Sequence, residues 1–139
     1  MKGQFNSPIR LPRDGDQVPI SGPLLNVDPE ARKATVVCVL VQGEENDPNN
    51  AVWVEGSGSW DRNGGDMWAG SVSREGAKPG GGTGTLQAGG EVRGIAMATI
   101  VRDGSVENGR LVPPSLETIT WCVGVSVEDD GGQATQYGS

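Results

Sequence analysis

Runs of apolar and β-branched residues alternate along this chain with short segments rich in glycine and proline. The strongest run is KATVVCVLVQG at residues 33–43, which is apolar on both faces at its centre. Comparable runs are EVRGIAMATIVRDG at 91–104 and LETITWCVGVSVEDDGG at 116–132. Such runs are typical of strands, and no predicted helix is long enough to connect parallel neighbours. The sequence therefore predicts an all-β, antiparallel fold.

We expect about seven strands in a single domain spanning residues 1–139, because the chain is long enough to bury one core. An antiparallel β-sandwich is the expected arrangement, with a closed barrel as the competing layout. The glycine-rich segment at about 76–90 has little to bury and is expected to form a flexible loop. The tail at about 131–139 is expected to be frayed.

Charge and composition exclude several classes of function. The formal net charge is -7, and Lys and Arg do not cluster, which argues against nucleic acid as a partner. No apolar run of about 18 residues predicts a membrane span, and MKGQFNSPIRLPRDG lacks the apolar core of a signal peptide. The chain has no histidine, the commonest general base, so we predict that it is not an enzyme.

Three of the four tryptophans lie in AVWVEGSGSWDRNGGDMWAGSV at 51–72. Trp53 and Trp121 lie inside apolar strands and are expected in the core. Trp60 and Trp68 flank the polar DRNGGD turn, and two interpretations stay open for them. They either fill the core or form an exposed platform that stacks against sugar rings.

The DRNGGD turn brings together Asp61, Asn63 and Asp66, whose side chains carry the oxygen ligands that calcium prefers. The turn lacks the ligand spacing of an EF-hand loop, so a plain hairpin turn is the favoured interpretation and a calcium site is the alternative. We therefore expect no cofactor, with calcium at this turn as the alternative.

Cys38 and Cys122 are the only cysteines, and each lies in an apolar run. They are either small buried apolar residues or the two halves of a disulfide.

The N-terminal sequence SPIRLPRDGDQVPISGPL at 7–24 resembles the opening of bacterial immunoglobulin-like modules, with the pattern I-x-x-P-x-x-G-x-x-V before a glycine-containing strand. The matching positions are Ile9, Pro12, Gly15, Val18 and Gly22. The resemblance implies an immunoglobulin-like antiparallel β-sandwich. Antibody-type domains carry a tyrosine two residues before the second cysteine, where this chain has Thr120, so their inter-sheet disulfide is not carried over.

These features predict a non-catalytic structural, decoration or adhesion module that docks on a larger assembly, such as a virion or cell-surface structure. The expected partner is a protein or another copy of the chain, contacted through sheet edges and loops. The strand with Pro19 and Pro23 and the strand around MWAGSV are the expected edges. The alternative is a carbohydrate-binding module that uses Trp60 and Trp68 and is stabilised by calcium. The expected location is extracellular, at the cell surface or in a virion.

Overall fold

The structure is a computed structural model that describes residues 1–44 and 46–129. The predicted frayed tail at 131–139 lies outside these residues. The described chain forms strands and two short 3-10 helices, η1 (Pro48–Asn50) and η2 (Arg62–Gly64), with no α-helix. Its strands are β1 (Lys2–Gly3), β2 (Ile9–Leu11), β3 (Gln17–Leu25), β4 (Ala31–Gln42), β5 (Val52–Asp61), β6 (Met67–Ser73), β7 (Glu75–Ala77), β8 (Thr83–Thr85), β9 (Glu91–Arg102), β10 (Ser105–Glu107), β11 (Arg110–Val112) and β12 (Ser115–Asp129). The predicted all-β class is confirmed.

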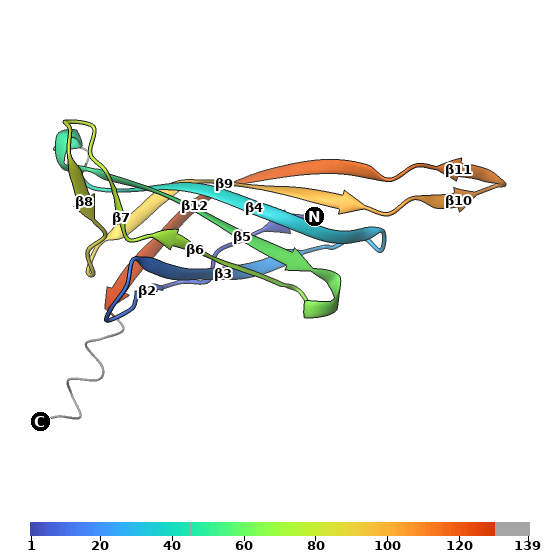
Figure 1. Ribbon diagram of the computed structural model, residues 1–139, viewed down its shortest axis with the longest axis horizontal. Helices are drawn as coiled ribbons and strands as arrows, with labels where there is room; N and C mark the ends of the chain where they lie inside the picture. The colour runs from blue at the N-terminus through green and yellow to red at the C-terminus, as the bar shows by residue number, and fades with distance from the viewer. Residues whose placement is uncertain (45, 130–139) are drawn as a thin grey trace, which may run out of the picture.

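Most strands belong to one curled sheet in the order β1-β3-β6-β5-β4-β9-β12-β2, to which β7 and β8 are attached beside β5 (Figure 1). Near the two ends of this order, β1 contacts β12 and β2 contacts β3, so the sheet curls until its ends meet. The β2–β12 pair is parallel, whereas the other pairs are antiparallel. The sheet is therefore mixed, and it has more strands than the seven expected from the sequence.

Alternation of side chains places the core inside the curl. In β4 the buried residues Ala34, Val36, Cys38 and Leu40 alternate with residues that face outward. The inward faces of β9 and β12 do the same, and together they form one continuous apolar cluster. Burial of each large apolar side chain stabilises the fold by about 1.5–3 kcal/mol.

An aromatic cluster fixes the N-terminal segment against the sheet. Trp68 on β6 is fully buried, and its indole N–H donates a hydrogen bond to the carbonyl of Gln4, with N and O 2.8 Å apart. The ring of Phe5 packs edge-on against Trp68 with a centroid distance of 4.8 Å. Trp121 on β12 completes the cluster at 6.3 Å from Trp68 and is partly buried.

Two expectations about individual segments are wrong. The segment 76–90, predicted as a flexible loop, includes parts of the paired strands β7 and β8, and Leu86 within it is buried in the core. The MWAGSV strand, predicted at a sheet edge, is β6 and lies between β3 and β5. In contrast, β3 with its prolines has only the two-residue β1 beyond it in the sheet order.

A hairpin projects from the end of the β9–β12 ribbon, and we call residues 103–114 the arm (Figure 1). Its strands β10 and β11 pair with each other as a separate two-stranded sheet. Asn108 and Gly109 form the tip with positive φ angles of 50° and 75°, as a type I′ hairpin turn requires. At the base, Arg102 is ion-paired with Asp28 and Glu117.

Candidate functional site

Of the two interpretations left open for Trp60 and Trp68, the exposed platform is wrong, because both residues are buried in the core. Trp60 is 3% exposed and Trp68 is 0% exposed. The indole N–H of Trp60 donates to the carbonyl of Gly65 at 2.7 Å. Trp53, expected in the core, is instead 51% exposed. The ring available to a ligand is therefore Trp53.

The DRNGGD turn uses its polar groups to hold its own backbone. The carboxylate of Asp61 accepts a hydrogen bond from the backbone N–H of Asn63 at 2.9 Å and caps η2. The carbonyl of Asp66 accepts from the N–H of Leu24. Residues 1–44 and 46–129 contain no group of three or more His, Cys, Asp or Glu side chains arranged to hold a metal. The contacts are those of a hairpin turn, and the calcium site stays a prediction.

The two cysteines lie on opposite faces of the sheet. Cys38 is paired with Ala96 and points inward, whereas Cys122 is paired with Ile95 and is exposed on the outside. Both are free thiols, so the disulfide considered from the sequence is wrong for this fold. Burial raises the pKa of Cys38 to about 11, which keeps it a neutral thiol at physiological pH.

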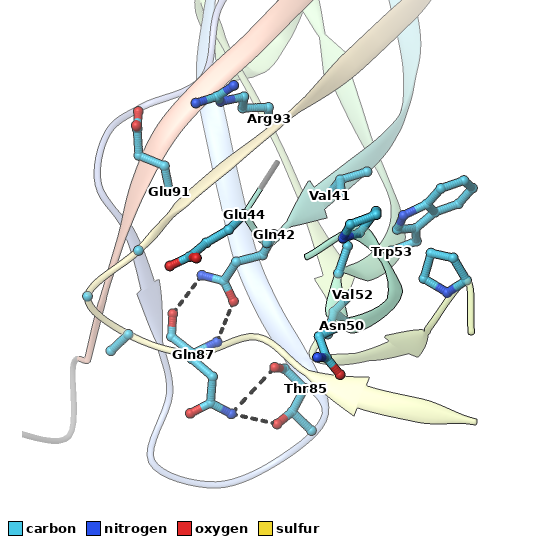
Figure 2. Close-up of a pocket in the computed structure, with 17 residues that line it drawn as sticks. Val41, Gln42, Glu44, Asn50, Val52, Trp53, Thr85, Gln87, Glu91 and Arg93 are labelled. Carbon is cyan, nitrogen blue, oxygen red and sulfur yellow. Dashed lines mark hydrogen bonds between the residues drawn. The ribbon is translucent and has the colours of Figure 1, made fainter. Parts of the chain in front are cut away.

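A pocket of about 970 Å³ opens beside Trp53, where β4 ends and β5 and β9 begin. Figure 2 shows Trp53 at one end of the lining residues and Glu91 with Arg93 at the other. Trp53, Val41 and Arg93 are neighbours in one row across β5, β4 and β9. The lining is completed by Gln42, Gly43, Glu44, Pro48, Asn50, Ala51, Val52, Pro79, Thr85, Gln87, Ala88, Gly89 and Gly90.

Paired hydrogen bonds hold one wall of this pocket in place. The side-chain amide of Gln42 donates to the carbonyl of Gln87 at 2.7 Å and accepts from its N–H at the same distance (Figure 2). The Gln87 side chain in turn donates to the hydroxyl oxygen of Thr85 at 2.9 Å. The loop that follows β8 is thereby fixed to the end of β4. An aromatic face beside carboxylate and amide groups suits a ligand that is rich in hydroxyl groups.

A second surface lies on the outer face of the same strands. Val37 and Val39 of β4 stand beside Met97 and Ile95 of β9, and we call these four residues the outer patch. They are exposed, with Ile95 at 53%. A groove of about 370 Å³ runs over the outer patch, and it is also lined by Cys38, Glu55, Gly56 and Thr120.

Comparisons of the chain with protein-family models, with curated proteins and with solved structures found no match. The described residues contain no helix that is long and apolar enough to cross a membrane.

The arm is an exposed element that the sequence predictions missed. It exposes Val106 at 72% and Leu111 at 79%, and these two residues face each other across the hairpin. Val112, and Leu116 just beyond the arm, are also exposed. The Asn-Gly pair at 108–109, between short apolar stretches, is the signal that could have identified this hairpin.

Proposed function

We propose that this chain is a non-catalytic module that docks on a larger protein assembly, such as a virion or cell-surface structure, through its arm. The observation that carries the proposal is the exposure of Val106 and Leu111 on a hairpin that projects from the body (Figure 1). Catalysis is not part of it, because the chain has no histidine and burial raises the pKa of Cys38 to about 11.

Beyond Asp103 at the base of the arm, which is ion-paired with Arg32, the two strands of the arm pair with no other strand of the described chain. A two-stranded hairpin alone is marginally stable in water, and β10 and β11 pair only with each other. Their outer backbone edges are open to a further strand, as in strand-addition complexes. Exposed apolar side chains and open strand edges are both more stable in contact with another protein surface than in contact with water.

The immunoglobulin-like interpretation belongs to the same proposal. It is supported by the N-terminal pattern, of which Ile9 and Val18 are buried in the core.

Removal of the arm tests the proposed function. Deletion of residues 105–114 leaves Asp103-Gly104 as a two-residue turn between Arg102 and Ser115, which are directly paired. Asp-Gly suits a type I′ turn, and the ion pair of Asp103 with Arg32 at 2.7 Å is kept. We expect the melting temperature of the arm-deleted chain to change little. In a pull-down from an extract of the source organism, the arm-deleted chain should no longer capture the partner protein.

The matched control is Leu25→Ser, which removes an exposed apolar side chain from β3, outside the arm. It should capture the same protein as the unmodified chain. Undiminished capture by the arm-deleted chain would contradict the proposal.

A second candidate function, glycan binding, is favoured by the pocket beside Trp53. The exposed indole offers a stacking face, and Glu44 and Asn50 offer groups for sugar hydroxyls. The carbohydrate-binding site predicted at Trp60 and Trp68 is therefore proposed at Trp53 instead, whose ring is accessible. The absence of clustered Lys and Arg favours neutral over anionic sugars.

Calorimetric titration with oligosaccharides of glucose, galactose, mannose and N-acetylglucosamine tests this candidate. We expect one of the four to bind and Trp53→Ala to weaken its binding about tenfold, since a stacked ring contributes up to about 1.5 kcal/mol. Met67→Ala, which removes an exposed apolar side chain elsewhere, is the control. No heat of binding with any of the four would end the glycan candidate.

A further inference from the structure

The arm joins the body at a break in the strand pairing. Two residues on each side, Asp103-Gly104 and Pro113-Pro114, separate the β9–β12 ladder from the β10–β11 pair. None of the four forms a ladder pair, and the prolines have no N–H to donate. The direction in which the arm projects is therefore set by other contacts at its base.

These contacts come from residues 28–32, which lead from the β3–β4 connection into β4 and which we call the bracket. Three alternate residues of the bracket hold the base of the arm: Asp28, Glu30 and Arg32. The carboxylate of Asp28 is ion-paired with Arg102. The backbone N–H of Asp103 donates to the carbonyl of Glu30 at 2.8 Å, and the Asp103 carboxylate accepts from Arg32 Nε at 2.7 Å.

The bracket is itself fixed to the body by Arg62 of the DRNGGD turn. Arg62 Nε donates to the carbonyl of Ala31 at 2.7 Å, and Arg62 Nη2 donates to the carbonyl of Asp28. The guanidinium lies 5.7 Å from the ring centroid of Trp60, which is buried in the core. The base of the arm is thus connected to the core through the bracket.

Arg102 is the centre of these contacts. Besides Asp28, it binds Glu117 of β12, to which its Nε donates at 2.9 Å. Its side chain is 26% exposed. Isolated exposed ion pairs contribute little to stability, but an arginine shared between two carboxylates forms a network, which is the case in which ion pairs count. Arg102 therefore ties β9 to β12 and to the bracket at the point where the arm begins.

We infer that the bracket holds the arm in one fixed direction before any partner is bound, with Arg102 as the positioning residue. A hairpin whose base is already closed pays less entropy to form. An arm ordered in advance also pays less when it docks. The inference rests on the proposed docking function for its purpose, and it concerns how the arm is presented and not what it binds.

Nitrogen-15 relaxation of the unmodified chain and of Arg102→Met tests the inference without any partner. In the unmodified chain we expect order parameters of about 0.85 for the arm amides, as for a rigid backbone, and in Arg102→Met values below about 0.6. Order parameters report only fast motion. Residual dipolar couplings of the arm should therefore also fit the alignment of the body in the unmodified chain and fail to fit it in the variant.

Arg10→Met is the matched control, because it removes an ion pair of the body, with Glu128 at 3.9 Å, and leaves the bracket intact. Its arm should stay as ordered as that of the unmodified chain. The amide chemical shifts of the body check that each variant is folded. If Arg102→Met does not fold, Asp103→Ala decides instead, since it removes an exposed side chain and its pair with Arg32, and it should also lower the order of the arm.

An arm that is already mobile in the unmodified chain would overturn the inference, and so would an arm that keeps its order in the folded variant. Failure of the proposed function gives a different result. An ordered arm that Arg102→Met releases, in a chain that captures no protein, would contradict docking and leave the bracket's role standing. Arm-dependent capture by a chain whose arm is mobile would do the reverse.

Discussion

Replacing Trp68 with alanine is expected to lower the free energy of unfolding by about 3–5 kcal/mol. The indole is fully buried, packs against Phe5 and Trp121, and donates its N–H to Gln4. Its loss leaves a cavity and an unpaired carbonyl, and it detaches the N-terminal segment from β6. Because single domains are stable by only about 5–15 kcal/mol, denaturant melts should show a barely folded protein.

Trp53→Ala is the matched control for this prediction. The same indole is removed, but from a site where half of its surface faces solvent. Its cost should stay within about 0.5–1 kcal/mol. If the two substitutions destabilise the chain equally, the assignment of buried and exposed rings is wrong.

The second large effect is expected from Gly22→Ala, at about 3 kcal/mol of lost stability. A Cβ atom at Gly22 would lie 1.8 Å from the carbonyl oxygen of Gln4, which is the acceptor of the Trp68 indole. A backbone atom cannot rotate away as a side chain can. The added methyl therefore displaces the N-terminal segment and weakens the bond to Trp68. Chemical denaturation followed by tryptophan fluorescence measures both consequences.

Gly124→Ala provides the comparison, since Gly124 is also a strand glycine and a Cβ built there meets no atom within 4 Å. We expect it to change stability by less than about 0.5 kcal/mol. Equal losses for the two glycines would mean that chain flexibility, and not the close approach to Gln4, sets the cost at Gly22.

The long strands could be predicted from the sequence because their apolar alternation is local. The runs at 33–43, 91–104 and 116–132 correspond to β4, β9 and β12. Pairing between distant strands carries no such local signal. The parallel β2–β12 pair and the position of β6 inside the sheet follow from the closing of the whole curl.

The candidate sites were harder to predict because an apolar strand does not reveal which of its faces is covered. Trp53 alternates with the buried Val52 and Val54, so burial of that valine face forces its ring outward. Trp60 has the same parity as the two valines and points inward with them. Gly56 and Gly58 occupy the inward positions between Val54 and Trp60, so the apolar alternation along β5 is interrupted in the sequence.

The pairing of β2 with β12 also determines when the fold can be completed. Ile9 is paired with Val127, and Arg10 lies 3.9 Å from Glu128, so residues from the start of the chain wait for a strand that is synthesised late. Contacts of such long sequence separation slow folding. Until β12 leaves the ribosome, the inner surface of the half-formed sheet stays open to water, and the nascent chain is most exposed to aggregation or to chaperones during that interval.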